Sequence, residues 1–190
     1  VYPELQDDED YVYSWDCDIR NVPTNDLIIN AKPIYSNCLI FKNNAVVGVS
    51  NKNVKNIVIP SKQKNGIPVT SIANHAFDGC EFLSSIVIPS SVSFIGDYVF
   101  MGCSSLTSIV VDPDNLVYDS RGGCNAIIES NSNKLLFGCP SSFIPSTVKC
   151  IKEFAFYDCP SLTSISIPSS VTSIDSGVFG GCSSLASIKI

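Results

Sequence analysis

A motif with a 23-residue period recurs along the chain, and this period restricts the possible folds more than any other property of the sequence. The segment 86–92, IVIPSSV, returns at 165–171 as ISIPSSV. Two residue types mark the end of each unit, and they form two columns: Phe77, Phe100, Phe156 and Phe179, and then Cys80, Cys103, Cys159 and Cys182. A unit of this length has an apolar face that it cannot bury alone. We therefore expect the units to stack into a solenoid.

Each unit contains the pattern Leu-x-x-Ile-x-Ile, which is typical of a short strand with one face inward. Isoleucines such as Ile86 and Ile109 should form inward ladders in a parallel sheet, and the alternate positions should face outward. The predicted strands end at six positions, namely Ile59, Ile88, Val111, Ile144, Ile167 and Ile190. The sequence thus predicts about five short coils and very little helix.

One coil is longer than the others, because 33 residues separate Val111 from Ile144. The added sequence, within about 117–139, reads as strand, turn and strand: 125–129 (NAIIE) and 134–137 (KLLF) have apolar centres, and 130–133 (SNSN) is polar. We expect a hairpin that projects from this coil.

The N-terminal part has a different character from the repeats. Residues 1–37 form an acidic leader and extension, 38–56 predict a β-hairpin cap with strands at 38–42 and 45–49, and the repeats occupy 57–190. Solenoid ends need such covers, since they would otherwise expose an apolar edge. The end at Lys189–Ile190 has no matching cap. It predicts either a fragment of a longer protein or end-to-end association of two copies through this strand.

Charge is concentrated at the N-terminus. The chain has a net charge of −6, and residues 1–20 alone account for it. The rest is neutral as a whole, which argues against nucleic acid and against anionic membrane surfaces as partners, because both require clustered Lys or Arg. The acidic run 7–10 lacks the spacing of a calcium loop and is interpreted as a solvated leader. No apolar run is long enough for membrane insertion.

The nine cysteines favour packing over chemistry. Four recur at one repeat position and should be small buried residues in the ladder. No Cys-x-x-Cys pair suggests zinc, so we expect no metal and no cofactor. Two disulfides are hypotheses, Cys17 with Cys38 in the cap and Cys124 with Cys139 across the predicted hairpin. An odd number leaves at least one thiol free unless chains are cross-linked.

Catalytic motifs are missing from the sequence. His75 is the only histidine, and no nucleophile elbow, Walker loop or dinucleotide fingerprint accompanies it. It is interpreted as a surface or rim residue. Asp97, Asp158 and Asp175 occupy turn-like positions, and turn formation explains them better than a pair of catalytic carboxylates. The chain is predicted not to be an enzyme. The alternative, a polysaccharide-active enzyme, requires two acids that converge in a pocket.

The repeat resembles the leucine-rich repeats of the BspA-like family of bacterial and protist surface proteins. The resemblance covers about 38–190 and lies in 106–109 (LTSI), 167–174 (IPSSVTSI), 76–80 (AFDGC) and 155–159 (AFYDC). The chain departs from the pattern at Asp112, which replaces proline, and at Val99 and Val178, which replace alanine. The resemblance implies a mainly β fold, a short right-handed leucine-rich-repeat solenoid with a strand on the concave face of each coil, few helices and the N-terminal β cap.

The resemblance also implies adhesion, since BspA-like proteins are associated with attachment to host matrix proteins such as fibronectin and fibrinogen. We therefore expect a secreted or cell-surface protein that binds a protein or glycan partner, including host extracellular matrix, through the concave sheet face. The outward strand positions are the candidate binding residues: Ser85, Val87, Ser108, Val110, Ser164, Ser166, Ser187 and Lys189. A structural spacer between other domains is a further alternative.

Overall fold

The computed structural model describes residues 38–190. The predictions for the acidic leader and for Cys17 lie outside the described residues. The strands within this range are β1 (Leu39–Lys42), β2 (Ala45–Val49), β3 (Asn56–Val58), β4 (Ser71–Ile72), β5 (Ser85–Ile88), β6 (Phe94–Ile95), β7 (Ser108–Val111), β8 (Tyr118–Asp119), β9 (Ile127–Glu129), β10 (Lys134–Phe137), β11 (Cys150–Ile151), β12 (Ser164–Ser166), β13 (Ser173–Ile174) and β14 (Ser187–Lys189). A single 3-10 turn, Arg121–Gly123, is the only helix of the described part. The predicted mainly β solenoid is confirmed.

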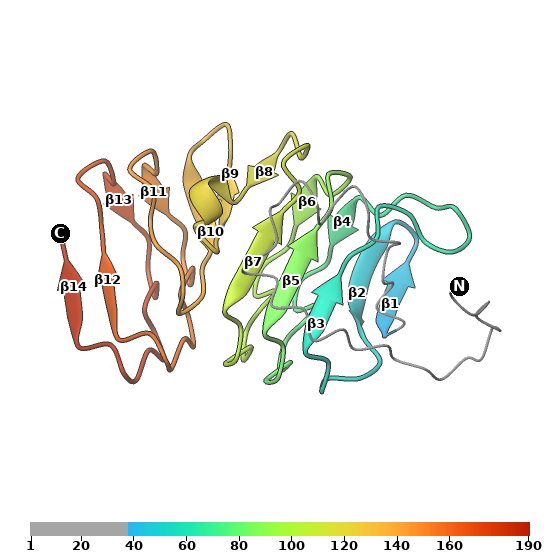
Figure 1. The fold of residues 1–190 in the computed structure, drawn as a ribbon, viewed down its shortest axis with the longest axis horizontal. Helices are drawn as coiled ribbons and strands as arrows, with labels where there is room; N and C mark the ends of the chain where they lie inside the picture. The colour runs from blue at the N-terminus through green and yellow to red at the C-terminus, as the bar shows by residue number, and fades with distance from the viewer. Residues whose placement is uncertain (1–37) are drawn as a thin grey trace, which may run out of the picture.

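The coils stack so that two walls face each other across the core (Figure 1). The first wall, called here the long-strand wall, contains the parallel sheets β3-β5-β7 and β12-β14. The second, the short-strand wall, contains the sheets β1-β2-β4-β6 and β13-β11-β10-β9-β8. The predicted ladder is present, because Ile57 pairs with Ile86 and Ile86 with Ile109, and all three are buried. The 23-residue period therefore sets the register between neighbouring coils.

The long-strand wall is interrupted between β7 and β12, where the sequence predicted a strand ending at Ile144. That prediction was wrong, since residues 138–149 contain no strand. The backbone N–H of Phe143 donates to the carbonyl of Cys124 and not to a neighbouring strand. Pro140 and Pro145 flank the segment, and proline lacks the N–H that a sheet ladder needs while it also restricts the residue before it. Ile144 still points into the core, at 7% exposure.

The predicted extra hairpin is present, since β9 and β10 pair antiparallel, but it does not project from the solenoid. It lies within the short-strand wall, where β10 also pairs with β11 and β9 also pairs with β8. Its two faces enter two separate cores. Ile127 and Leu136 pack into the first core, whereas Ile128 and Leu135 pack into the second. Such a strand pair is buried on both sides, so β9–β10 acts as a partition between two halves of the molecule.

A buried asparagine connects the first half to β8, the strand that pairs with β9 of the partition hairpin. Asn115 is 7% exposed, and its amide nitrogen donates to the carbonyls of Pro89 (2.9 Å) and Val92 (2.8 Å). Its oxygen accepts from the N–H groups of Val117 and Tyr118. All four hydrogen-bonding positions of the amide are thus satisfied, as a buried polar group requires.

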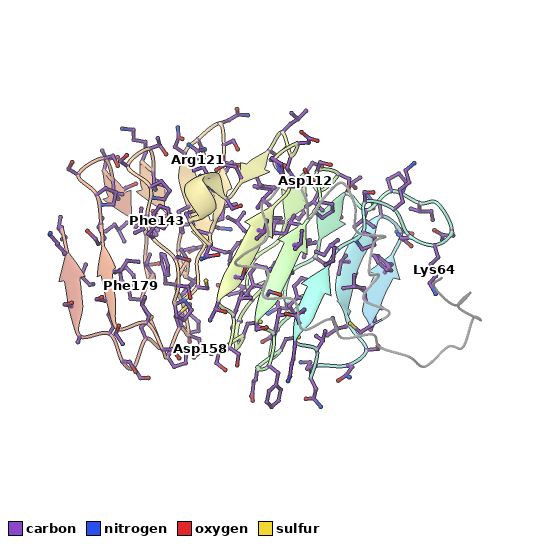
Figure 2. The ribbon with its side chains drawn as sticks, viewed as in Figure 1. Lys64, Asp112, Arg121, Phe143, Asp158 and Phe179 are labelled. Carbon is purple, nitrogen blue, oxygen red and sulfur yellow. The ribbon has the colours of Figure 1, made fainter. Side chains whose placement is uncertain are left out.

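Arg121 closes the outer edge of the partition (Figure 2). Its guanidinium contacts both carboxylate oxygens of Asp119, at 2.7 and 2.5 Å, and also Asn133 and Thr147. The hydroxyl of Ser130 donates to the same carboxylate. Burial disfavours the charged form of Asp119, but the hydrogen bonds from Arg121 and Ser130 outweigh it and lower its pKa. The network connects β8, the β9–β10 turn and the following coil.

The N-terminal hairpin predicted at 38–56 is confirmed in its pairing. β1 and β2 are antiparallel, and β2 continues into the wall by parallel pairing with β4. β10 pairs with β11 in the same way. The turn of each hairpin contains an asparagine with positive φ, 55° at Asn43 and 53° at Asn133, a conformation that asparagine tolerates better than most residues. We call β1–β2 the cap hairpin.

Candidate functional site

The outward positions of the long-strand wall divide into two patches and do not form one surface. In the first half, Val58, Val87 and Val110 stand in register and are half-buried. In the second half, the predicted binding positions are exposed and pair as Ser164 with Ser187 and Ser166 with Lys189. The segment 142–144, where a strand was predicted but is not formed, separates the two patches. The eight predicted residues are therefore not brought together, although seven of them keep some exposure to solvent.

Ser85 is the exception, and its prediction as a contact residue needs correction. The side chain is only 7% exposed, and its hydroxyl donates to Asn56 Oδ1 at 2.6 Å. Asn56 lies on the adjacent strand β3 and accepts from Ser84 as well. The Ser85 hydroxyl thus forms its hydrogen bond within the sheet. The alternation of inward and outward side chains along a strand does not reveal this hydrogen bond.

The phenylalanine and cysteine columns lie inside the solenoid. The rings of Phe77 and Phe100 stack with centroids 5.8 Å apart, and those of Phe156 and Phe179 lie 5.7 Å apart. The thiol of Cys103 donates to the carbonyl of Phe77 in the preceding coil at 3.1 Å, and Cys182 donates likewise to Phe156. Burial and the neighbouring Cys80 raise the pKa of Cys103 to about 12. Cysteine therefore suits this position because its small thiol can satisfy a buried carbonyl.

The disulfide predicted between Cys124 and Cys139 is not formed. Both residues are buried free thiols, and each bonds a different carbonyl: Cys124 Sγ lies 3.8 Å from Ala126 O, and Cys139 Sγ lies 3.4 Å from Asn125 O. Cys38 is also a free thiol, and its predicted partner Cys17 lies outside the described residues. Within residues 38–190, no three potential ligands come together as a metal site. The same part of the chain holds no helix that could span a membrane.

A column of exposed aromatic side chains lies at the turns that follow the short strands, and sequence reasoning missed its importance. His75, Tyr98 and Phe154 occupy equivalent repeat positions and all have positive φ, between 55° and 58°. Glycine, which adopts this conformation without strain, fills the same position in the last coil as Gly177. The signal was present, because three rings and a glycine in one column indicate a left-handed turn that displays a side chain.

The angle between neighbouring rings of this column changes at the boundary between the halves. The rings of His75 and Tyr98 are stacked, with centroids 5.2 Å apart and an angle of 16° between their planes. Tyr98 and Phe154 lie 5.4 Å apart but are tilted by 42°. His75 itself is half-exposed, which confirms its interpretation as a surface residue, and its Nδ1 lies 3.5 Å from Asp78.

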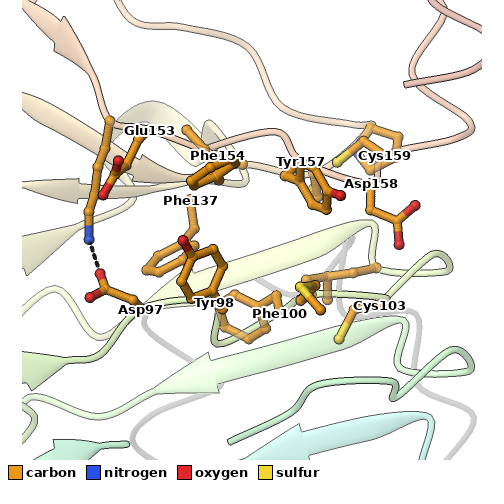
Figure 3. Close-up of a pocket in the computed structure, with 17 residues that line it drawn as sticks. Asp97, Tyr98, Phe100, Cys103, Phe137, Glu153, Phe154, Tyr157, Asp158 and Cys159 are labelled. Carbon is orange, nitrogen blue, oxygen red and sulfur yellow. Dashed lines mark hydrogen bonds and ion pairs between the residues drawn. The ribbon is translucent and has the colours of Figure 1, made fainter. Parts of the chain in front are cut away.

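A small pocket opens where the rings tilt apart (Figure 3). Tyr98 and Phe100 from the first half form one side, and Phe154, Tyr157 and Phe137 from the second half form the other. Its volume is about 40 Å³. We call this space the junction pocket. It is far smaller than a typical small-molecule site of about 300–1,000 Å³, so it suits a single side chain and not a sugar ring.

Charged groups surround the junction pocket. Lys152 Nζ donates to Asp97 Oδ1 at 2.6 Å across the boundary and lies 5.7 Å from the centre of the Phe137 ring. Glu153 and Asp158 line the same space. Of the three carboxylates interpreted as turn residues, Asp97 and Asp158 thus line the same pocket, while Asp175 pairs with Lys134 at 3.1 Å. The polysaccharide alternative requires two acids that converge, but Asp97 and Asp158 lie at opposite ends of this small pocket (Figure 3).

The first coils carry an excess of positive charge that the whole-chain balance concealed. Residues 38–77 contain lysines but no acid, and the lysines are all exposed: Lys42, Lys52, Lys55, Lys62 and Lys64. Lys64 lies on the loop at this end of the solenoid (Figure 2). The predicted absence of basic clustering therefore holds for the repeat region as a whole but not for these coils.

Comparisons with known proteins agree with the observed geometry. A model of the BspA type leucine rich repeat region matches in 6 copies over residues 48–121 and 127–190. Among solved structures, the chain is similar to a leucine-rich repeat protein from T. pallidum (29% identity, 77% of this chain and 63% of that one, TM-score 0.47). It is also similar to a leucine rich cell surface protein from Faecalibacterium prausnitzii (31% identity, 76% and 34%, TM-score 0.47).

The pneumococcal vaccine antigen PcpA is a more distant sequence with the same kind of fold, at 16% identity and a TM-score of 0.54, over 73% of this chain and 40% of that one. The chain thus spans less than two thirds of the length of these three structures. No curated protein matches the sequence.

Proposed function

Because the chain belongs to the BspA-type leucine-rich repeat family, we propose that it is a non-enzymatic protein-binding module of an exported or cell-surface protein that adheres to host matrix or cell-surface partners. Family membership supports a role in protein interaction. The finer features, namely secretion, adhesion and host partners, extend what the resemblance implies for this chain.

The observation that carries the proposal is the exposed patch on β12 and β14. Ser164, Ser166 and Ser187 are exposed, stand on hydrogen-bonded strands and lack side-chain hydrogen bonds in the described part of the chain. Short hydroxyl side chains on a rigid sheet lose little conformational entropy when a partner covers them. Lys189 adds one positive charge to the same face.

The test is binding of the chain to immobilised fibronectin and fibrinogen by biolayer interferometry. A variant with Ser164→Glu, Ser166→Glu and Ser187→Glu should lose binding, because three carboxylates would have to be desolvated in the interface. A matched variant places the same three charges on exposed turn residues, with Ser90→Glu, Ser146→Glu and Ser169→Glu, and should bind as the parent does.

A second variant, Val87→Glu with Val110→Glu, tests the first patch in the same assay. If both patch variants bind as the parent does, the long-strand wall is not the binding face. If the parent protein binds neither matrix protein, the proposal of host matrix attachment is overturned.

End-to-end association is the other partner proposal. β14 pairs with β12 along one edge, and in the 190-residue chain Ile188 and Ile190 are 43% and 92% exposed. An apolar strand of this kind can pair with a second copy. Light scattering should show a dimer that Ile188→Lys together with Ile190→Lys converts to a monomer; a monomeric parent protein would contradict the proposal.

A further inference from the structure

The junction pocket differs from the rest of the aromatic ladder because the rings that meet across it are not stacked. In the first half, rings of neighbouring coils cover each other's faces, with planes within 16° of parallel for His75 on Tyr98 and 15° for Phe77 on Phe100. Across the boundary, Phe100 meets Phe137 edge-on at 87°, and Tyr98 meets Phe154 at 42°. Tyr98 and Tyr157 stay 38% and 40% exposed at the pocket, so part of their aromatic surface is open to another group.

The pocket already holds one cation on an aromatic face. Lys152 Nζ lies 5.7 Å from the Phe137 ring centre while Asp97 neutralises it at 2.6 Å. This is the geometry of a cation–π contact with a carboxylate counter-ion. The arrangement places one cation between an aromatic ring and a carboxylate of the pocket.

Two further carboxylates in the lining lack such a counter-ion. The ion pairs among residues 38–190 include neither Glu153 nor Asp158, although both line the pocket. Glu153 is exposed and Asp158 half-buried. With Asp97 and Lys152 paired, the lining keeps two negative charges, Glu153 at the end where Asp97 lies and Asp158 at the opposite end (Figure 3).

We infer that the junction pocket binds an arginine side chain presented by a protein partner. The inference deepens the proposed function and rests on it, since it names one chemical feature of the partner. A guanidinium is flat enough to lie against a ring face, and its several N–H donors can reach a carboxylate in paired fashion, which an ammonium group cannot do. A volume of about 40 Å³ matches the head of one side chain.

The backbone conformation at the rings that border the pocket is unfavourable for bulky residues. Tyr98 and Phe154 have φ of 55° and 58°, and Gly177 shows that the repeat accepts glycine there. Bulky residues in this conformation cost free energy that glycine would not. The two rings that border the pocket thus lie at positions whose positive φ is unfavourable for aromatic residues.

The experiment uses the full 190-residue chain and two short blocked peptides, acetyl-Gly-Arg-Gly-amide and acetyl-Gly-citrulline-Gly-amide. Citrulline has nearly the shape of arginine but no charge. Titration followed by two-dimensional NMR should give saturable shifts with the arginine peptide, with Kd on the order of 1–10 mM, and no saturable shifts with the citrulline peptide. Equal responses to the two peptides would overturn the inference.

Two variants place the peptide in the pocket. Glu153→Gln removes an exposed charge, and Tyr98→Asn removes a ring while it keeps a residue that tolerates positive φ. Each substitution should raise the Kd of the arginine peptide about fivefold. Glu81→Gln, an exposed acid outside the pocket lining, is the matched control and should leave Kd unchanged.

Tyr98→Asn removes a packed ring and so can lower the thermal midpoint of unfolding. Glu153→Gln disturbs no packed side chain, so its effect on binding can still be interpreted in that case. Unchanged affinity in Glu153→Gln, or an equal loss in Glu81→Gln, would show that the peptide binds elsewhere. The triple Ser→Glu variant of β12 and β14 should bind the arginine peptide normally. Failure of matrix binding and failure of arginine binding are therefore separate results.

Discussion

The two hairpins of the molecule have the same topology but bury different amounts of side chain. In the cap hairpin, Val46 is fully buried, and the remaining residues of β1 and β2 are half-buried or exposed. In the partition hairpin, β10 has three consecutive buried residues, Leu135 to Phe137, because one face enters each core. The pairing pattern comes from the local sequence, whereas burial depends on how many neighbouring coils a hairpin contacts.

The largest expected effect comes from comparing one isoleucine in each hairpin. Ile128 on β9 is fully buried, while Ile40 on β1 is 45% exposed. Ile128→Ala should lower the free energy of unfolding by about 2–5 kcal/mol, since it leaves a cavity in the second core. Ile40→Ala should cost roughly 1 kcal/mol or less. Urea denaturation measures both, and equal losses would mean that the partition is no more buried than the cap.

The next effect concerns the attachment of the partition to the first half. Asn115→Ala leaves the carbonyls of Pro89 and Val92 without their side-chain donor and should cost about 2–3 kcal/mol in urea denaturation. Asn131→Ala, in the exposed β9–β10 turn, is the control and should change stability by less than about 0.5 kcal/mol. A small effect at Asn115 would indicate that its hydrogen bonds contribute little to holding the halves together.

The smallest expected effect compares the cysteines near the two hairpins at alkaline pH. Burial raises the pKa of Cys124 to about 11, against about 8.5 for an unfolded thiol. Below both values the thiol is protonated in both states and full stability is present. As pH rises from about 8.5 toward 11, only the unfolded state releases its proton, so folding stability falls, by about 1–2 kcal/mol at pH 10.

Cys124→Ala should reduce this alkaline loss in denaturation curves recorded between pH 8 and pH 10. Cys38→Ala should reduce it less, because Cys38 is half-exposed. An alkaline limb that is identical in the parent and in Cys124→Ala would show that this thiol ionises equally in both states.

The sequence predicts the direction of side chains well and their surroundings less well. The period placed Ile86, Ile109 and Ile165 inward, and all are buried. It also located both hairpins. It did not show that the second hairpin has a core on each side, since consecutive buried residues read as an ordinary apolar strand until the neighbouring coils are known.

Two local properties were visible in the sequence but were outweighed by the repeat. Pro140 and Pro145 prevent a strand at 142–144, yet the period implied one there. Ser85 follows the outward pattern, but its hydroxyl is used by Asn56. The candidate pocket was not predictable at all, because it arises from the tilt between Tyr98 and Phe154, and a tilt between coils is a property of packing.

The boundary between the halves has a mechanical consequence. No strand pairing or backbone hydrogen bond among the described residues joins 38–111 directly to 124–190, and the connection consists of side chains such as Asn115, Tyr118 and the Lys152–Asp97 pair. Under a stretching force along the stack, these contacts carry the load in place of a continuous sheet. The protein should therefore extend in two steps, first by parting at the boundary and then by unravelling coil by coil.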